Sequence, residues 1–217
     1  MLAMFLSFAM ANPIVNGQNE TEFPSAVALG AQFGDSGFSA CTGNLITPKI
    51  ILSAAHCGED LPMELVIQLG KAFFGNSVND SEVIIGFSEL IVHPDYEELE
   101  GTLGGSLGAY DFGLLVLAEE APIQPTLFRH EALTEEHIGT ELTSVGFGIT
   151  GANQNDSGTK RSADLTLDSL QEMFIISDSN SNPNNANICS GDSGGPMFFF
   201  DEEIGEYVQW AVHSWGD

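Results

Sequence analysis

Short apolar runs separated by turn residues make up most of the chain, and this pattern predicts β-strands. The runs are rich in β-branched and aromatic residues, and Gly, Pro, Asn or Asp bounds most of them. They cover residues 64–70, 82–92, 112–117, 141–149, 165–176, 196–200 and 207–212. Apolar positions with helical spacing are scarce, and residues 133–139 are expected to form a turn or two of helix. The pattern therefore predicts an all-β protein.

A hairpin is predicted from two further runs, residues 37–46 and 50–54, which Thr47-Pro48-Lys49 joins. The regular succession of short strands and turns is typical of a barrel or a sandwich. One low-complexity segment, DSNSNPNNAN at residues 178–187, is strongly polar. We expect it to be a mobile surface loop with no capacity to pack.

Charge is strongly biased toward acidic residues. The 217 residues include 31 Asp and Glu against 5 Lys and Arg, a formal net charge of −26, and the acids are spread over both halves of the chain. A surface of this kind cannot displace the counterions of phosphates, which excludes nucleic-acid binding. It also argues against adhesion to an anionic membrane. With 43% apolar residues, the chain can bury a sizeable core.

The first eleven residues, MLAMFLSFAMA, are almost wholly apolar. They end in Ala9-Met10-Ala11, which is typical of a small-residue signal cleavage site, although no Lys or Arg precedes it. The stretch is too short to span a bilayer. We expect residues 1–11 to be the remnant of a signal peptide and the protein to be secreted; the alternative is a buried N-terminal strand.

Three short segments carry candidate chemistry. LSAAHC places His56 straight after a predicted strand, DFGLLVL places Asp111 at the mouth of another, and GDSGGP places Ser193 among glycines. Each has an ordinary explanation when taken alone: a core histidine, a turn aspartate and a loop serine.

Together the three side chains provide what nucleophilic acyl transfer requires. A serine hydroxyl is a weak nucleophile, so a base must remove its proton as it attacks, and histidine suits that task. A carboxylate on the second ring nitrogen fixes the tautomer and stabilises the imidazolium. The glycines around Ser193 allow a sharp turn, in which the N–H groups of Gly191 and Ser193 converge on an oxyanion.

These segments resemble the landmark motifs of the trypsin/chymotrypsin-type serine proteases, as do Ile14-Val15-Asn16-Gly17 and Ser214-Trp215-Gly216. The order His, Asp, Ser and the spacings agree with that family. The resemblance implies two packed six-stranded antiparallel β-barrels, residues 14–122 and 123–217, with the triad His56, Asp111 and Ser193 in the cleft between them.

A rival explanation comes from the G-x-S-x-G pattern around Ser193, which also marks the nucleophile of α/β-hydrolases. That fold needs the chain order Ser, Asp, His and strands that alternate with helices. The one histidine after Ser193 is His213, and the helices are missing from the pattern. We expect His213 to be a barrel side chain beside the cleft rather than a base.

The resemblance also implies roles for further residues. Cys41 and Cys57 match a disulfide that clamps the histidine loop, worth about 3 kcal/mol in the chain-entropy model. Ser214, Trp215 and Gly216 match the segment that pairs with the substrate backbone. Asn187 matches the residue at the floor of the specificity pocket.

An activation ion pair is implied as well. Asp192 matches the residue whose carboxylate pairs with a newly formed N-terminal ammonium, here that of Ile14. Forming that ammonium requires cleavage after Pro13, so residues 12–13 are expected to be a short pro-segment.

Three features depart from the family pattern. Pro13 is not the basic residue that a trypsin-like activator would cut after, and Asn187 offers no charge to a Lys or Arg side chain. Cys189 matches a cysteine whose partner would follow the final Ser-Trp-Gly, but the sequence stops at Asp217. We therefore expect a truncated chain with an incomplete second barrel.

The predicted function is that of a secreted serine endopeptidase that works through an acyl-enzyme intermediate. The expected partners are polypeptide substrates and protein protease inhibitors, with no nucleic acid, membrane, cofactor or metal, and the expected state is a monomer. The alternative is a non-catalytic secreted binding protein on the protease fold.

Overall fold

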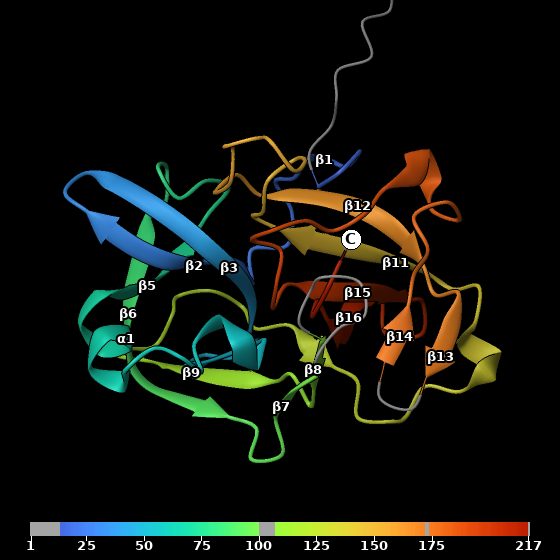
Figure 1. The fold of residues 1–217 in the computed structure, drawn as a ribbon, viewed down its shortest axis with the longest axis horizontal. Helices are drawn as coiled ribbons and strands as arrows, with labels where there is room; N and C mark the ends of the chain where they lie inside the picture. Colours follow the sequence, from blue (N-terminus) through green and yellow to red (C-terminus); the bar gives the residue numbers. More distant parts are fainter. Residues whose placement is uncertain (1–13, 100–106, 172–173, 217) are drawn as a thin grey trace, which may run out of the picture.

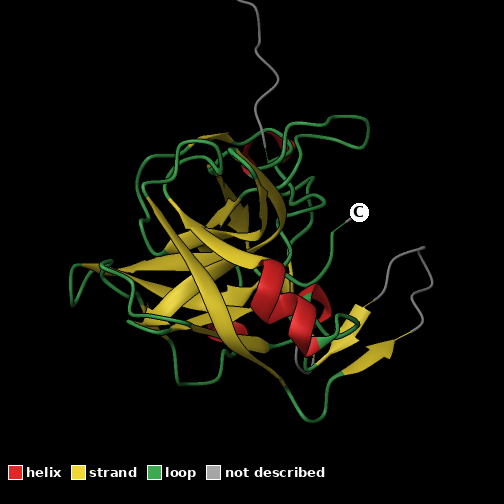
Figure 2. Ribbon diagram, turned by 90° about the vertical axis from the view of Figure 1, so that its left-hand side faces the viewer, coloured by secondary structure: helices red, strands yellow, loops and turns green. Residues whose placement is uncertain are grey.

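The computed structural model describes residues 14–99, 107–171 and 174–216. Strands dominate these residues, and the helical segments are short (Figure 2). They are α1 (Met63–Leu69), η1 (Ala55–Cys57), η2 (Glu135–His137) and η3 (Pro183–Asn185). Within the described residues, no helix has the length and apolar character needed to cross a membrane. The predicted all-β fold class is confirmed.

Six strands close into a barrel in the order β2-β3-β4-β9-β6-β5, and every neighbouring pair is antiparallel (Figure 1). They are β2 (Ala26–Phe33), β3 (Ser36–Thr47), β4 (Ile50–Ser53), β5 (Gly70–Phe74), β6 (Val83–Val92) and β9 (Gly113–Leu117). Along β9, Gly113, Leu115 and Leu117 are buried and the residues between them are less so, which is the period of two that a strand requires. The inward side chains form the barrel core, around Val27 and Leu45.

A second six-stranded sheet lies beside the barrel, in the order β1-β12-β11-β15-β16-β10 (Figure 1). Its strands are β1 (Gln18–Asn19), β10 (Leu127–Phe128), β11 (Glu141–Gly146), β12 (Arg161–Thr166), β15 (Pro196–Asp201) and β16 (Glu206–Val212). β10 pairs with β16 in parallel, and the other pairs are antiparallel. Within the described residues this sheet is not closed, in line with the predicted incomplete second barrel, and its edge strand β10 is the one that pairs in parallel.

The barrel and the second sheet pack directly against each other. Ala26 of β2 shares an apolar cluster with Val145 of β11 and Phe198 of β15. A buried hydrogen bond of 2.8 Å runs from Asn44 Nδ2 in β3 to Gln209 Oε1 in β16. These contacts fix the relative position of two units that come from distant parts of the sequence.

Residues 64–70 were predicted as a strand, and this prediction is wrong because most of the segment forms helix α1. Pro62 precedes the helix and Glu64 lies in its first turn, both favourable at a helix N-terminus. Val66 is buried, but Met63, Leu65 and Ile67 are exposed. A short run that is apolar on every side cannot be assigned to helix or strand by periodicity.

Two other predicted elements lie close to their predicted residue ranges. The hairpin is formed by β3 and β4, and the helical turn is η2. The run at residues 165–176 is not one strand, because β12 ends within it and a separate antiparallel pair follows, β13 (Ser169–Gln171) with β14 (Phe174–Ile176). A second small pair is β7 (Glu97–Leu99) with β8 (Leu107–Ala109). Some strands were not predicted: β1, β2, β5, β7, β8 and β10.

The polar segment at residues 178–187 is not wholly unpacked, which corrects that part of the prediction. Asn182 within it is buried. Its Oδ1 accepts hydrogen bonds from the Thr166 backbone N–H at 2.7 Å and from Ser177 Oγ at 3.0 Å, and its Nδ2 donates to the Ala186 carbonyl at 2.9 Å. A buried asparagine with partners for both ends of its amide anchors the segment to the second sheet.

Two predictions concern the N-terminus: a signal remnant at residues 1–11 and a pro-segment at residues 12–13. Both lie outside the described residues.

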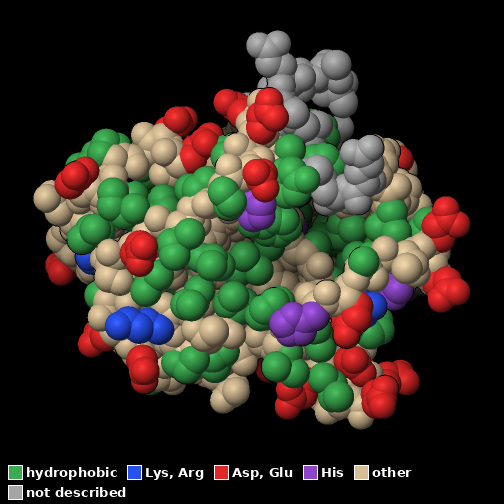
Figure 3. Space-filling model, turned by 90° about the horizontal axis from the view of Figure 1, so that it is seen from below, with side chains coloured by type: hydrophobic (Ala, Val, Ile, Leu, Met, Phe, Trp, Pro, Cys, Tyr) green, Lys and Arg blue, Asp and Glu red, His purple; other side chains and the backbone are tan. Residues whose placement is uncertain are grey.

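On the face that Figure 3 shows, acidic side chains lie mainly around the edge and hydrophobic side chains gather toward the middle.

Candidate active site

His56 and Asp111 are brought together by the barrel register. β4 and β9 are antiparallel neighbours with Ser53 opposite Gly113, so the residues just after β4 lie beside those just before β9. His56 Nδ1 lies 2.7 Å from Asp111 Oδ2, and the His56 backbone N–H donates to Asp111 Oδ1 at 3.0 Å. The carboxylate is thus held against both the ring and the backbone of the histidine.

Ser214 supplies a third hydrogen bond to this carboxylate, because its hydroxyl donates to Asp111 Oδ2 at 2.7 Å. Asp111 is only 5% exposed. Burial alone would raise the pKa of Asp111, but the hydrogen bonds from His56 and Ser214 stabilise the charged form, and the pKa lies below its ordinary value. The sequence placed Ser214 at the substrate backbone and gave no sign that its hydroxyl reaches a residue 103 positions away.

The Ser193 loop is clamped onto the barrel. The Thr42 backbone N–H in β3 donates to the Ser193 carbonyl oxygen at 2.8 Å, and Cys57 Sγ lies 3.6 Å from the same oxygen. The loop turns sharply at Gly194, whose φ is 80°. A Cβ at Gly194 would lie 2.0 Å from Ser53 Oγ and 2.4 Å from the Thr42 carbonyl oxygen, so only glycine fits there. Ser193 is therefore held next to the segment that carries His56.

Cys41 and Cys57 form a disulfide between β3 and η1. One nitrogen of the His56 ring lies within 4.8 Å of both sulfur atoms. Because both sulfurs are bonded to each other, they are not thiolate ligands for a metal ion. The disulfide holds the histidine turn against the strand that also binds the Ser193 carbonyl. Cys189, which lies within the described residues, is a free cysteine.

Asp192 is fully buried directly before Ser193. Its Oδ1 accepts a hydrogen bond from the Gly148 backbone N–H and its Oδ2 accepts one from the Cys189 backbone N–H, both at 2.8 Å. Burial raises the pKa of Asp192 to about 6, against the opposing effect of these hydrogen bonds and of Arg161. Burial therefore makes the charged form of this carboxylate costly, and the two backbone hydrogen bonds and Arg161 offset part of that cost.

Ile14, the predicted partner of Asp192, is also fully buried. The following residue, Val15, forms a bridge with Asn187, whose backbone N–H donates to the Val15 carbonyl at 3.1 Å. In the sequence Ile14 is joined to Pro13, so its nitrogen is an uncharged peptide nitrogen. The structure thus pairs Val15, directly after the buried Ile14, with the start of the segment that leads to Asp192.

A cavity of about 420 Å³ brings together most of the predicted substrate-binding residues: Asn187, Ser214 and Trp215, with Asp111 at its edge. Gly216 lies against this wall, because a Cβ there would be 2.6 Å from Ile188 Cγ1. Much of the remaining lining is apolar and includes Phe112, Leu170, Phe174, Ile175 and Trp210. The cavity suits an uncharged side chain.

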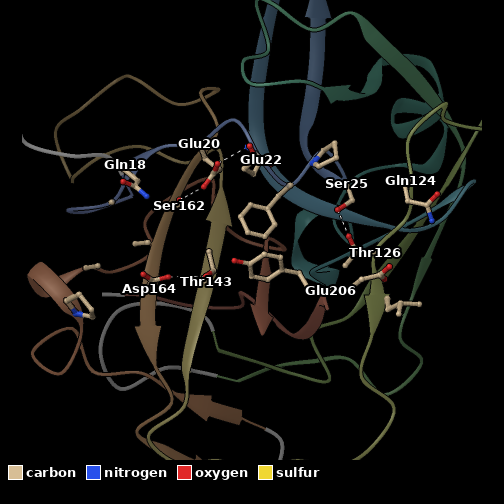
Figure 4. A pocket seen from close by; sticks show the side chains of 18 of the residues that line it. Gln18, Glu20, Glu22, Ser25, Gln124, Thr126, Thr143, Ser162, Asp164 and Glu206 are labelled. Atoms are coloured by element: carbon tan, nitrogen blue, oxygen red, sulfur yellow. Dashed lines mark hydrogen bonds between the residues drawn. The ribbon is translucent and has the colours of Figure 1, made fainter. Parts of the chain in front are cut away.

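A larger cavity of about 680 Å³ lies elsewhere, between β1, β12 and the segment before β10 (Figure 4). Four carboxylate residues line it: Glu20, Glu22, Asp164 and Glu206. Glu20 Oε2 accepts a hydrogen bond from Ser162 Oγ at 2.7 Å, and the side-chain hydroxyl groups of Ser25 and Thr126 are hydrogen-bonded to each other. None of the predicted catalytic residues lines this cavity. The smaller cavity is lined by Asp111 of the predicted triad but not by His56 or Ser193, so it is the candidate substrate pocket beside the triad.

His213 is a buried neighbour of the site, as expected, and not a base. Its Nε2 lies 2.9 Å from Ser144 Oγ, and its Nδ1 lies 3.2 Å from the Asp192 carbonyl oxygen. Burial lowers the pKa of His213 to about 4. The ring is therefore neutral in the folded protein at neutral pH.

This burial predicts an acid-sensitive contribution to stability. The unfolded chain takes up a proton at His213 near pH 6.5, whereas the folded chain does so only near pH 4. The contribution is fully present above pH 6.5 and is lost as the pH falls toward 4, by at most roughly 3 kcal/mol. We expect His213→Gln to flatten the fall of the unfolding free energy over this range, measured by urea denaturation. The exposed His130→Gln is the control; equal slopes for His213→Gln and wild type would contradict the prediction.

The family model Trypsin matches residues 14–217. The chain is 26% identical to clotting factor C of Tachypleus tridentatus over 245 aligned residues, which cover 94% of this chain and 23% of that protein. It is 27% identical to phenoloxidase-activating factor 1 of Holotrichia diomphalia over 221 residues, covering 86% and 58% of the two chains.

Vitamin K-dependent protein C of Rattus norvegicus is 27% identical over 198 residues, which cover 82% of this chain and 41% of that protein. This chain thus spans less than two thirds of the length of each of these relatives. The family model, in contrast, matches nearly all of the chain. The chain therefore belongs to the trypsin family of serine proteases.

Proposed function

We propose that this chain is a secreted serine endopeptidase that hydrolyses peptide bonds through an acyl-enzyme intermediate. The observation that carries the proposal is the buried Asp111 carboxylate, which is hydrogen-bonded to His56 Nδ1 at 2.7 Å. The Ser193 loop is held beside the histidine turn by the hydrogen bond from the Thr42 backbone N–H to the Ser193 carbonyl oxygen. A non-catalytic protein has no need to bury a carboxylate behind a histidine in this way. The apolar start of the sequence and the disulfide support secretion.

In the proposed mechanism, Ser193 Oγ attacks the carbonyl carbon of the substrate and His56 Nε2 takes the hydroxyl proton. Asp111 holds the His56 ring with its Nδ1–H toward the carboxylate and stabilises the imidazolium that forms. The backbone N–H groups of Gly191 and Ser193 bind the oxyanion. His56 then gives its proton to the leaving amine. In the second half of the reaction a water molecule attacks the acyl-enzyme, His56 takes the proton from this water, and His56 returns the proton to Ser193 Oγ as the acyl group leaves.

The proposed substrates are polypeptides with an uncharged side chain at the residue that is cleaved. Asn187 provides no carboxylate at the end of the pocket, and the cavity around it is largely apolar. Ser214, Trp215 and Gly216 are proposed to pair with the substrate backbone. Protein protease inhibitors that imitate such a substrate would bind the same cavity.

We further propose residues 14–122 and 123–217 as the two structural domains and a monomer as the working state.

An active-site probe tests the proposal. We expect an organophosphonate to add once to a chain prepared to begin at Ile14, and peptide mapping to place the adduct on Ser193. The same chain should cleave a mixed peptide library. Protein denatured before treatment is the control, because isolated serines do not react. A folded chain beginning at Ile14 that takes up no probe and cleaves no peptide would instead support the alternative, a non-catalytic binding protein.

A further inference from the structure

A buried hydroxyl group lies behind the Ser193 loop and takes no part in the proposed chemistry. It belongs to Thr42, which lies in β3 and is fully buried. Thr42 Oγ1 donates to the Gly191 carbonyl oxygen at 2.8 Å and accepts a hydrogen bond from the Phe147 backbone N–H at 3.1 Å. Burial of a hydroxyl group is costly unless it is hydrogen-bonded, and here the group both donates and accepts.

The Thr42 side chain holds the peptide group between Gly191 and Asp192. That peptide connects the two residues, Gly191 and Ser193, whose N–H groups are proposed for the oxyanion hole. Its carbonyl accepts from Thr42, and its N–H, which is that of Asp192, donates to the Cys189 carbonyl oxygen at 3.0 Å. Because a peptide group is planar, these two hydrogen bonds fix its orientation, and that orientation sets the angle between the two proposed donors.

Gly191 is the point of the loop that most needs a contact from outside. Its φ is 97°, in the region that favours glycine, and a glycine restricts the peptide groups on either side of it least. A Cβ at Gly191 would lie 2.9 Å from Gly148 Cα, so a stiffer residue does not fit there without a shift of the backbone. The Thr42 hydroxyl therefore supplies a restraint that the Gly191 backbone lacks.

Backbone groups hold the neighbouring peptides of the loop. The Ser190 carbonyl, which belongs to the same peptide as the Gly191 N–H, accepts from the Ile149 backbone N–H at 2.9 Å, and the Asp192 carbonyl accepts from the Gly195 backbone N–H at 2.8 Å. A substitution does not remove those two hydrogen bonds. The Gly191 carbonyl, in contrast, is bonded to a side chain, so a single substitution can release it and leave the other contacts in place.

The Phe147 contact directs the Thr42 hydroxyl toward Gly191. Because the oxygen accepts from a backbone N–H, its own hydrogen is left for the Gly191 carbonyl, and the two hydrogen bonds strengthen each other. The branched Cβ of threonine also limits rotation of the side chain. The next residue, Gly148, donates its N–H to Asp192 Oδ1 at 2.8 Å, so the segment 147–148 holds the loop both directly and through Thr42.

We propose that Thr42 is a positioning residue whose hydroxyl holds the Gly191–Asp192 peptide so that the N–H groups of Gly191 and Ser193 converge on the oxyanion. The inference rests on the proposed function and deepens it at the same site. Thr42 contacts neither the substrate nor the reacting atoms, and it acts through the backbone of the loop. Its effect falls on the transition state, in which the oxyanion forms, and not on binding of the uncharged substrate.

Peptide hydrolysis by chains prepared to begin at Ile14 tests the inference. We expect Thr42→Val, which keeps the shape but lacks the hydroxyl, to lower kcat about tenfold, or about 1.4 kcal/mol, with little change in KM. The loss is smaller than the roughly 10²- to 10³-fold seen when an oxyanion donor itself is removed, because the backbone contacts of the loop remain. Thr42→Ser, which restores a hydroxyl, should recover most of the rate. Ser39→Ala is the matched control, because Ser39 is a buried hydroxyl residue of the same strand that donates to the Cys41 carbonyl at 3.3 Å instead.

Two inhibitors built on the same peptide separate positioning from a merely structural role. In a peptidyl trifluoromethyl ketone, Ser193 Oγ adds to the carbonyl carbon, the hydroxyl proton passes to His56, and the carbonyl oxygen becomes an oxyanion. The corresponding peptidyl alcohol forms no such adduct. We expect Thr42→Val to bind the ketone about tenfold more weakly than the wild type does, and the alcohol equally tightly. A general disturbance of the substrate pocket would weaken both inhibitors alike.

The outcomes are distinguishable. If the wild type cleaves no peptide and does not bind the ketone, the proposed function itself fails. If the wild type is active, the inference alone is overturned by an unchanged kcat in Thr42→Val, by equal weakening of the two inhibitors, by a Thr42→Ser rate as low as that of Thr42→Val, or by the same loss in Ser39→Ala. Thermal midpoints measured in parallel show which variants fold. Thr42→Ala takes the place of Thr42→Val in every comparison if the valine variant does not fold.

Discussion

Replacement of Ser193 by alanine is expected to lower kcat for peptide hydrolysis by about 10⁶-fold, the loss seen when the nucleophile of such a triad is removed. Without the hydroxyl, no acyl-enzyme forms, and His56 has no proton to take from the attacking group. The fold should be unchanged, because the structure holds this loop through the Ser193 backbone carbonyl rather than the side chain. Initial rates with a peptide substrate and the thermal midpoint, measured together, check both statements.

Ser190→Ala is the matched control for this prediction. Ser190 is an exposed serine in the same loop, and its carbonyl oxygen, which the variant keeps, accepts a hydrogen bond from the Ile149 backbone N–H at 2.9 Å. We expect its kcat to stay close to that of the wild type. Substantial peptide cleavage by Ser193→Ala would mean that another group is the nucleophile, and the proposed mechanism would have to be abandoned.

Replacement of Asp111 by asparagine is expected to lower kcat by about 10⁴-fold with little change in the fold. Asparagine has the shape of aspartate but presents an N–H₂ group to one of its three donors, which are the His56 backbone, His56 Nδ1 and Ser214 Oγ. The ring is then driven into the tautomer that cannot accept the Ser193 proton at Nε2. The imidazolium that forms during attack also loses its counter-charge.

Steady-state kinetics of Asp111→Asn against wild type measure this effect, with the exposed Asp95→Asn as control. We expect KM to change much less than kcat, because Asp111 acts through His56 on the transition state and does not hold the substrate. A loss in kcat of less than about tenfold, or 1.4 kcal/mol, would show that the buried carboxylate does not govern the histidine.

Local signals were sufficient for much of the strand assignment. Alternation of burial along β9 and the Pro48 turn between β3 and β4 act within a few residues, so the sequence pattern contains them. The same reasoning failed at α1, where the apolar residues cover every side of the helix and leave Leu65 and Ile67 exposed. Periodicity identifies an element by its one apolar face, so it cannot assign a segment whose apolar residues lie on every side.

The candidate triad could be predicted as a set of residues, but its geometry could not. Motif chemistry pointed to His56, Asp111 and Ser193, because few other residue types perform acyl transfer. The hydrogen bond from Ser214 to Asp111 joins positions 103 residues apart and depends on how the last described residues return to the barrel. No local pattern distinguishes that hydroxyl from any other serine.

The sequence by itself determined the all-β class, the membership of a serine protease family and the residue types of the candidate site. Those properties follow from side-chain periodicity and from chemistry that needs particular residues. Only the tertiary structure decided how distant polar groups are joined: the Arg161 guanidinium, at the start of β12, donates to the Gly148 carbonyl, and the Gly148 N–H donates to Asp192 Oδ1. Charges interact over distances in space, and the packing of β12 against the Ser193 loop sets those distances, whereas their spacing along the chain does not.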